Sequence, residues 1–280
     1  MALLLLAQAA LPGRVEAATV DHGLRPESAG EAAMVARLCD ELDVRHETLS
    51  VSLTTGNLQD RARHARYRAL AEWCKRRGLG ALATGHQLDD QTETLVMRLN
   101  RGSGLAGLAG VRARGSVPAT SLPLLRPLLG WRRAELETVV AEAGIEPARD
   151  PSNESDRFDR VRVRKALADA EWLDPQGLAR SAALLGEAED FVAEKIEEAW
   201  CERVTREGAS LRFTPGPSDF EATEIARRII LELGGDPPRS EAATLVARMR
   251  RGENASLGGV LASPRPDGRW RFVPEPSRRN

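Results

Sequence analysis

The chain has few aromatic residues and no excess of charge of either sign. Aromatic side chains make up 4% of its 280 residues. Proteins that hold single-stranded nucleic acid stack the bases on aromatic side chains, so we expect no surface of that kind. Lys and Arg number 40 against 41 for Asp and Glu, a net charge of −1, which excludes a protein that depends on non-specific attraction to polyphosphate. Any contact with nucleic acid must therefore come from local basic patches.

Cysteine is scarce, and long apolar runs are lacking. Cys39, Cys74 and Cys201 stand far apart with no C-x-x-C pair, so the sequence predicts neither a disulfide framework nor a zinc site. No stretch reaches the roughly 20 apolar residues of a membrane span. The apolar segment 1–10 faintly resembles a signal peptide, but no basic residues precede it. We expect a helix there, and a cytoplasmic protein with buried free thiols.

In the first half of the chain, short apolar runs alternate with helical patterns. Apolar residues recur at helical spacing behind each strand-like run, as expected for parallel strands joined by crossover helices. The pattern therefore predicts an α/β fold with a doubly wound parallel sheet. The expected strands are 15–20, 44–51 and 81–84, and the expected helices are 2–10, one capped at Ser28 that runs to Leu42, 57–78, one that follows residue 84, and 131–143.

The second half has a different composition. A turn sequence at 150–153 opens a basic run, and a long amphipathic helix is expected over 177–208. Shorter helices at 220–234 and 239–251 precede a hairpin through Pro266-Asp267-Gly268. We place a domain boundary near residue 175, with an α/β domain over 1–175 and a mostly helical α+β domain over 176–280.

The strongest candidate for chemistry is the segment from Thr84 to Glu93, where an expected strand ends and a helix begins. At about 100° per residue, one helical face would present an imidazole and three carboxylates, those of His86, Asp89, Asp90 and Glu93. Open α/β sheets bind ligands at the edge formed by the carboxyl ends of their strands, and this segment follows such an end. Carboxylates suit Mg²⁺, which binds them together with substrate phosphates. The alternative is a solvated acidic helix face.

Two further segments are candidates for binding a phosphate-rich ligand. The run 21–25, Asp-His-Gly-Leu-Arg, follows the first strand and could line a ligand-binding site, although these residue types are also common in turns. The run 61–68 holds four arginines and a histidine within two helical turns. Such crowded like charges repel unless an anion is near, so a phosphate partner and a solvated helix face balanced by Asp60 and Glu72 are both open.

Two more segments combine small or basic residues. The glycine-rich run 101–108 could bring backbone N–H groups close to phosphate, or could be a flexible connection. The run 158–165, Phe-Asp-Arg-Val-Arg-Val-Arg-Lys, is the densest basic stretch of the chain. It is the best candidate for an RNA backbone contact, with a basic surface helix as the alternative.

In this order and spacing, these segments resemble the tRNA(Ile)-lysidine synthetase family of N-type ATP pyrophosphatases. The similarity runs from residue 1 to about 165, and Ser256-Leu257-Gly258-Gly259 resembles the family's C-terminal domain. The resemblance implies an adenine nucleotide alpha hydrolase-like fold and a carbon–nitrogen ligase. ATP would adenylate the carbon-2 oxygen of the wobble cytidine of tRNA(Ile), and the amine of free L-lysine would then displace AMP to form lysidine. The resemblance also implies Mg²⁺, which would hold the phosphates.

The resemblance also assigns roles to individual residues. The catalytic residues would be His86, Asp89, Asp90, Glu93 and Arg63, and the three carboxylates would organise Mg²⁺ or the lysine ammonium group. The nucleotide would be bound by Asp21, His22, Arg25, Gly85, Arg101, Gly102 and Ser103. The tRNA would be bound by Arg66, Asn153, Arg160, Arg162, Arg164 and Lys165, and by the C-terminal domain. We expect no membrane partner and leave a homodimer open.

Two features depart from the family pattern. The family carries a Ser-Gly-Gly-x-Asp-Ser phosphate loop after its first strand, and this sequence begins at the Met that follows such a loop. Without that strand, 17–20 would have no neighbour, and the simplest explanation is a start set too far downstream, so the activity of this chain is open. In addition, Val161 stands where the family usually has Asn.

Three other functions are considered. A sulfur-inserting tRNA relative would be expected to carry paired cysteines, which this chain lacks. A non-catalytic tRNA-binding remnant would bind tRNA without using ATP. A metal-dependent hydrolase built on His86 would need further histidine ligands, and His22, His46 and His64 are the others in the chain.

Overall fold

The computed structural model describes residues 1–21, 27–51, 58–146 and 159–275, and it divides the chain into two compact units. The first unit is Met1–Glu187 and the second is Ala188–Asn280. The boundary near 175 that the sequence suggests coincides with the first residue of helix α8 (Pro175–Arg203), and the division between the units falls inside this helix.

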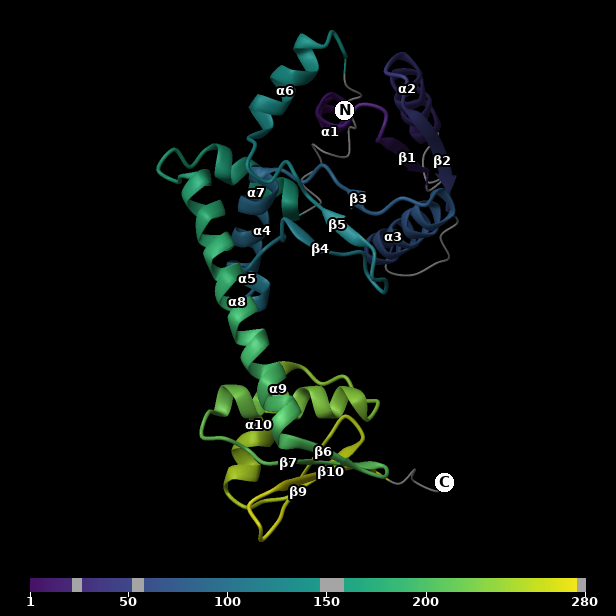
Figure 1. The fold of residues 1–280 in the computed structure, drawn as a ribbon. Helices are drawn as coiled ribbons and strands as arrows, with labels where there is room; N and C mark the ends of the chain where they lie inside the picture. Colours follow the sequence, from purple (N-terminus) through teal and green to yellow (C-terminus); the bar gives the residue numbers. More distant parts are fainter. Residues whose placement is uncertain (22–26, 52–57, 147–158, 276–280) are drawn as a thin grey trace. The chain divides into compact units, whose positions relative to one another are not determined.

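The first sheet of unit 1 is a parallel pair. Strand β1 (Glu16–Asp21) pairs with β2 (Arg45–Ser50) in parallel over six residue pairs, from Glu16↔Arg45 to Asp21↔Ser50. Helix α2 (Glu27–Glu41) connects the two strands and lies against them, as the crossover pattern predicts (Figure 1). The expectation that 17–20 would lack a neighbour is therefore wrong, because β2 supplies one along its full length.

The second sheet of unit 1 contains the strand that leads into the candidate site. Strand β3 (Leu82–Ala83) pairs in parallel with β5 (Pro123–Leu125), and β5 pairs antiparallel with β4 (Arg114–Ser116). Helix α3 (Leu58–Arg77) contacts both β1 and β3, and its Tyr67, Trp73 and Cys74 share one apolar cluster with Leu82 and Leu124. The described strands of unit 1 thus form two separate sheets where the sequence predicts one, although the parallel pairs confirm the α/β class.

The apolar start of the chain is a helix, as predicted. Helix α1 (Ala2–Ala10) packs against α6 (Arg133–Glu142) through a cluster that includes Ala2, Leu136 and Val140. Within the described parts of the chain, no helix is long and apolar enough to cross a membrane. Cys39 and Cys74 are buried free thiols, as expected, whereas Cys201 is exposed.

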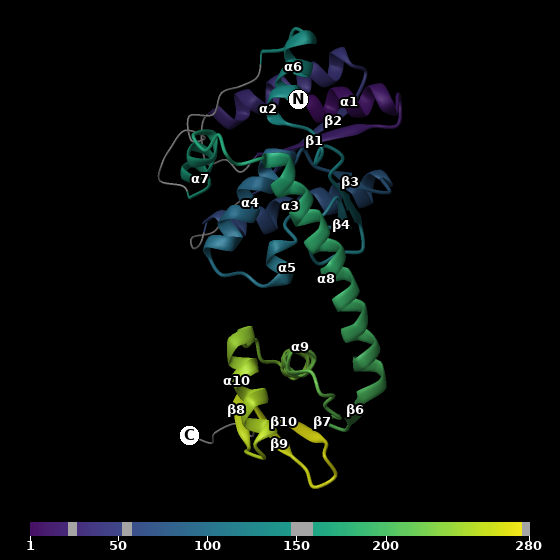
Figure 2. The ribbon, with the colours of Figure 1, turned by 90° about the vertical axis from the view of Figure 1, so that its left-hand side faces the viewer.

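Unit 2 is an antiparallel sheet with two helices packed on it. The strands run in the order β6-β7-β10-β9-β8, and helices α9 and α10 lie on one side of them in both views (Figures 1 and 2). Their shared core includes Phe213, Ile229, Val246 and Phe272. The elements are β6 (Val204–Glu207), β7 (Ser210–Phe213), α9 (Asp219–Glu232), α10 (Arg239–Arg250), β8 (Ala255–Leu257), β9 (Val260–Pro264) and β10 (Trp270–Pro274).

The sequence predicts two helices and one hairpin of this unit, but it predicts a mostly helical domain and misses the strands that complete the five-stranded sheet. The helices α9 and α10 and the β9–β10 hairpin are confirmed, and Gly268 takes the left-handed conformation (φ 79°) that its turn needs. The long helix predicted to reach residue 208 ends at Arg203, however, and the next four residues form β6. Strands β6 and β7 meet at Gly208, which has φ 59°.

Candidate active site

The candidate site is built around the first turn of helix α4 (Leu88–Asn100), directly after β3. The Gln87 side chain accepts a hydrogen bond from the Asp89 backbone N–H (2.8 Å), and Gln87 N–H donates to Asp90 Oδ2 (3.0 Å). This reciprocal cap fixes the start of the helix at Leu88. His86 therefore precedes the cap, and the prediction that it shares a helical face with the three carboxylates is wrong.

Helix α4 buries polar side chains as well as apolar ones. Leu88 and Leu95 are buried, but so are Gln91, Thr92 and Glu93. Gln91 accepts a hydrogen bond from Val111 N–H (2.7 Å), and the Thr92 hydroxyl lies 3.2 Å from the Pro175 carbonyl oxygen. Burying a polar group costs free energy unless the group is hydrogen-bonded. These two contacts therefore offset the cost of burying Gln91 and Thr92.

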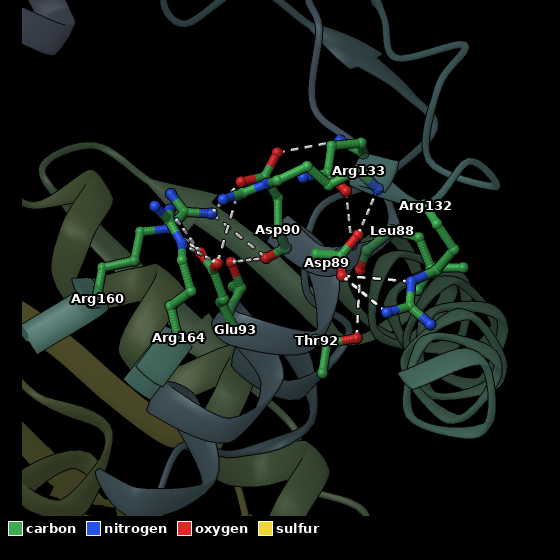
Figure 3. A network of polar contacts seen from close by, with 11 residues as sticks. Leu88, Asp89, Asp90, Thr92, Glu93, Arg132, Arg133, Arg160 and Arg164 are labelled. Atoms are coloured by element: carbon green, nitrogen blue, oxygen red, sulfur yellow. Dashed lines mark hydrogen bonds and ion pairs between the residues drawn. The ribbon is translucent and has the colours of Figure 1, made fainter. Parts of the chain in front are cut away.

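Glu93 is the most deeply buried charge of the site, with 1% of the residue exposed. Arg160 Nε donates to one of its carboxylate oxygens at 2.6 Å, and Arg164 Nε donates to the other at 2.7 Å. A third guanidinium group, that of Arg133, lies 3.6 Å away. Arg160 and Arg164, which donate the two short hydrogen bonds, both belong to helix α7 (Asp159–Ala168) (Figure 3). A buried carboxylate is stable only with such charged partners.

Asp89 and Asp90 are paired in the same way, to different elements. Asp89 accepts a hydrogen bond from the Arg133 backbone N–H (2.7 Å) and forms an ion pair with Arg132 (3.2 Å). Both arginines stand at the start of α6. Asp90 Oδ1 accepts from Arg160 Nη2 at 2.9 Å. In Figure 3 the α7 arginines approach from one side of α4, and Arg132 approaches from the other. We refer to Asp89, Asp90 and Glu93 together as the acidic corner.

A pocket of about 220 Å³ opens beside the acidic corner. One part of its wall is charged and belongs to the network in Figure 3, and the other part is apolar. A pocket of this kind suits a ligand that has charged ends and an apolar stem. Its lining residues are Asp89, Thr92, Glu93, Arg132, Arg133, Arg164, Leu167, Ala168 and Pro175.

His86 lies near the cations of the site. Its Nδ1 is 2.9 Å from the Thr84 hydroxyl, and burial lowers the pKa of the imidazole below its ordinary value of 6.5. The charge of Asp90 acts in the opposite direction, while Arg126, Arg63 and Arg160 lower this pKa further. The imidazole is therefore neutral at pH 7 and able to accept a proton there.

The acidic corner does not fit a magnesium ion as it stands. In the part of the chain that the structure describes, no group of three or more His, Cys, Asp or Glu side chains is arranged to hold a metal. The carboxylates are engaged by guanidinium groups instead. Mg²⁺ prefers near-ideal octahedral oxygen ligands, which carboxylates held in these ion pairs do not offer.

The glycine-rich run after α4 has a different role from the predicted one. Gly102 (φ 64°) ends the helix, its N–H donates to the Leu99 carbonyl oxygen, and Ser103 N–H donates to that of Arg98. Those N–H groups are therefore committed to the helix cap, which disagrees with a phosphate nest. Because α4 has 13 residues, this end lies about 20 Å from His86. The structure does not bring Arg101, Gly102 and Ser103 to the imidazole.

The basic residues of α7 divide into two groups. Arg160 and Arg164 face α4 and pair with its carboxylates, a contact that the sequence does not predict, and their contact with tRNA stays a prediction. Arg162 is exposed and pairs with Asp159, which also pairs with Arg101 (3.2 Å). Arg101 and Arg162 line a second pocket, of about 320 Å³, between α4 and α7. Lys165 is exposed on the same helix, and Arg63 and Arg66 are exposed on α3.

The remaining predicted residues are partly outside the described structure. Asp21 ends β1, and the exposed Gly85 lies between β3 and the α4 cap. His22, Arg25 and Asn153 lie outside the described residues.

Sequence reasoning missed three arginines of the site, Arg126, Arg132 and Arg133. Arg126 follows β5, which pairs with β3, and its charge acts on His86. A signal existed for the other two. Two cations at the start of a helix oppose its dipole, which favours negative charge there. Such a placement at the start of α6 indicates that acidic partners are nearby, and Asp89 is one of them.

Comparison with known proteins identifies the family. The model of the PP-loop domain family matches residues 1–171. A tRNA(Ile)-lysidine synthase of Novosphingobium aromaticivorans is 47% identical over 287 residues, covering 100% of this chain and 87% of that protein. The enzyme of the same name from Zymomonas mobilis is 36% identical, covering 95% of this chain and 82% of its own length.

A solved structure agrees on the fold. A U34-tRNA thiolase of Methanococcus maripaludis, solved with its 4Fe–4S cluster, superimposes with a TM-score of 0.54 at 17% identity, covering 67% of each chain. At this identity the similarity concerns the fold alone, and it confirms the predicted fold class. From the domain match and the close relatives together, the chain belongs to the tRNA(Ile)-lysidine synthase family of PP-loop proteins.

Proposed function

We propose that this chain catalyses the ATP-dependent attachment of L-lysine to carbon 2 of the wobble cytidine of tRNA(Ile). The carbon-2 oxygen would attack the α-phosphate of ATP and release pyrophosphate. An amine of lysine would then attack carbon 2, and AMP would leave with that oxygen. The observation that carries the proposal is the buried imidazole of His86, whose pKa burial lowers, next to the charge of Asp90 in a chain that is 47% identical to a lysidine synthase.

The His86 side of the site suits the adenylated base. Three guanidinium groups, those of Arg63, Arg126 and Arg160, act on the imidazole from three different elements. Positive charge held in place stabilises the charge that develops on a departing phosphate. The attacking amine loses a proton as its bond to carbon 2 forms. His86 would accept that proton through Nε2, because Nδ1 already contacts Thr84.

The acidic corner and its pocket suit the lysine. The corner is already filled by cationic N–H donors, which indicates that an ammonium group would be accepted there. Leu167, Ala168 and Pro175 would contact the methylene groups of lysine, and the guanidinium groups of Arg132 and Arg133 would attract its carboxylate. We therefore assign the three carboxylates to the amino acid. Mg²⁺ would arrive on the triphosphate, since it binds substrate phosphates with few protein ligands.

The RNA would be bound by exposed cations around this site. Arg66 on α3 and Arg162 and Lys165 on α7 are exposed, and Asn153 precedes α7 in the chain. Phosphate contacts by such residues position an RNA without reading its sequence. The reaction would take place in the cytoplasm, where tRNA and reduced cysteines are found. A homodimer stays a prediction.

The direct test measures ATP-dependent incorporation of labelled lysine into a tRNA(Ile) transcript with cytidine at position 34. Asp90→Ala should abolish incorporation while the protein stays folded, because this carboxylate pairs with Arg160 and faces His86. Asp159→Asn is the matched control, an exposed carboxylate paired with Arg101 and Arg162. Incorporation by Asp90→Ala at the wild-type rate would refute the assignment. Tight tRNA binding with no incorporation by the wild-type chain would favour a non-catalytic tRNA-binding remnant.

A further inference from the structure

We propose that Arg160 and Arg164, which we call the arginine pair, occupy the amino-acid subsite until RNA phosphates draw them away, so that RNA binds before lysine. The inference rests on the proposed function and adds to it an order of substrate binding. Its starting point is that the acidic corner is already filled by cations of the chain itself, as Figure 3 shows.

The contacts leave little capacity for another cation. Both oxygens of Glu93 accept short charged hydrogen bonds, at 2.6 and 2.7 Å. Asp90 Oδ1 accepts from Arg160 at 2.9 Å, and Asp90 Oδ2 accepts from the Gln87 backbone. An ammonium group that is to pair with the buried Glu93 must therefore replace a guanidinium group. The arginine pair is in this sense a competitor of the substrate, built into the chain.

The helix that carries the arginine pair is held to α4 mainly by charge. Within α7, Val161 is the only buried side chain. The side chains of Arg160 and Arg164 are 40% and 31% exposed, so an anion can approach them from solvent. Ion pairs of partly exposed groups are weak and sensitive to competing ions. Phosphates that bind Arg162 and Lys165 on the same short helix would stand close to the arginine pair.

The other side of the acidic corner is different. Arg132 is the N-cap of α6 and Arg133 is its first residue, and Leu136 and Val140 of this helix are buried in the apolar cluster with α1. The Arg132 backbone N–H is also capped by Glu135 (2.6 Å). Asp89 is bound by the Arg133 backbone N–H, which cannot leave without moving α6. The α7 side is therefore the side that can open, while the α6 side stays in place.

An exchange of partners leaves every charge satisfied. Before RNA binds, each guanidinium group of the arginine pair is paired with carboxylate. Afterwards it would be paired with phosphate, which accepts the same two-pronged geometry, and the freed carboxylates would be paired with the lysine ammonium group. Removing the arginines with no incoming cation would strand the buried charge of Glu93, which is strongly unfavourable. The two events are therefore coupled, and each substrate favours the binding of the other.

The first experiment measures L-lysine binding to the full chain by calorimetry, without ATP, in the presence and absence of the tRNA transcript. We expect RNA to tighten lysine binding about tenfold. Arg164→Gln should bind lysine without RNA about as tightly as the wild type does with RNA. Arg162→Gln is the matched control, because it removes the same charge from the same helix but from a residue that pairs with Asp159, and its RNA-free lysine affinity should match the wild type.

A second variant guards against simple damage to the fold. Arg164→Lys keeps the charge but loses the two-pronged geometry, so its RNA-free lysine affinity should lie between those of the wild type and Arg164→Gln. Equal RNA-free lysine binding by Arg164→Gln and Arg162→Gln would overturn the proposal. So would a lysine affinity of the wild type that does not change with RNA.

Amide hydrogen exchange over 159–168 separates this inference from the proposed function. With lysine present, binding of the tRNA transcript should raise exchange in α7 and leave that of α6 (133–142) unchanged. Unchanged protection of α7 with RNA bound would refute the release of the arginine pair even if lysidine is formed. Release of α7 without any lysidine formation would refute the proposed function and leave the release intact.

Discussion

The two units of the chain bury different kinds of residue. Unit 2 has one continuous core, in which Phe213, Ile225, Ile229 and Phe272 are completely buried. Unit 1 has two smaller apolar clusters, and four of its buried side chains are polar and stand next to one another at the start of α4: Gln87, Gln91, Thr92 and Glu93. Burial in unit 2 gives stability, whereas burial around α4 fixes the position and partners of charges. The predictions below test this difference.

The largest effect is expected in the core of unit 2. Phe213 is fully buried and contacts the ring of Trp270 edge to face at 5.7 Å. Phe213→Ala should cost about 3–5 kcal/mol of the free energy of unfolding of this unit, because it leaves a cavity. Phe220→Ala is the control, since Phe220 is 45% exposed, and it should cost about 1 kcal/mol or less. Urea unfolding followed by tryptophan fluorescence measures both. Equal costs would contradict a core concentrated between the sheet and its helices.

A smaller loss of stability, with a complete loss of function, is expected at Glu93. Glu93→Gln removes the charge that Arg160 and Arg164 share, and the free energy of unfolding should fall by about 2–3 kcal/mol, less than for fully buried partners because both arginines are partly exposed. Lysine incorporation should be abolished. Asp159→Asn, at an exposed ion pair, should cost about 0.5 kcal/mol. Thermal unfolding and the incorporation assay check the two expectations, and a stable, active Glu93→Gln protein would refute both.

Gly110 tests how tightly the polar residues of α4 are packed. It has φ 65°, and a Cβ there would lie 2.7 Å from the Gln91 side chain. Gly110→Ala should cost about 2–3 kcal/mol, from backbone strain together with this clash. Gly144 has a similar φ of 69° with nothing within 4 Å of its Cβ, so Gly144→Ala should cost about 1 kcal/mol, from backbone strain alone. The difference between the two, measured by chemical unfolding, reports the Gln91 contact, and no difference would argue against it.

The smallest effect is the pH dependence due to His86. Burial and nearby arginines lower the pKa of this imidazole in the folded state below the ordinary 6.5, so below pH 6.5 the unfolded chain binds the proton first. Stability should therefore fall as the pH falls from 6.5 toward the folded-state pKa, and should be independent of this group above 6.5. His86→Gln should flatten that part of the profile, as measured by thermal unfolding from pH 7.5 to 5. An unchanged profile would contradict the buried, neutral imidazole.

Local patterns predict most helices and the strands β1, β2 and β3 of unit 1, because apolar spacing determines these elements. The sequence predicts no strand around Pro123, where β5 forms because it pairs with β3 and β4. In the same way, the segment 204–207 continues the helical pattern but becomes β6 because β7 pairs with it. Such outcomes depend on neighbours distant in sequence, which periodicity does not report.

For the site, the sequence indicated the charged residues but not their partners. The segment Thr84–Glu93 was correctly placed at the carboxyl end of a strand, and Asp89, Asp90 and Glu93 lie together there. Their assignment to Mg²⁺ did not anticipate that guanidinium groups would fill the corner. Arg160 and Arg164 were read as surface cations because the spacing within a basic run does not show which side of a helix faces a buried carboxylate.

The two oxygens of Asp90 are engaged by different parts of the chain. Oδ2 accepts the backbone N–H of Gln87, which caps the helix, while Oδ1 accepts the guanidinium group of Arg160 from another helix. One oxygen of the carboxylate therefore holds the first turn of α4 in place. The other oxygen is an acceptor whose hydrogen-bond donor can be exchanged. A cation can bind and leave at Oδ1 without breaking the capping hydrogen bond at Oδ2, so the start of the helix stays folded.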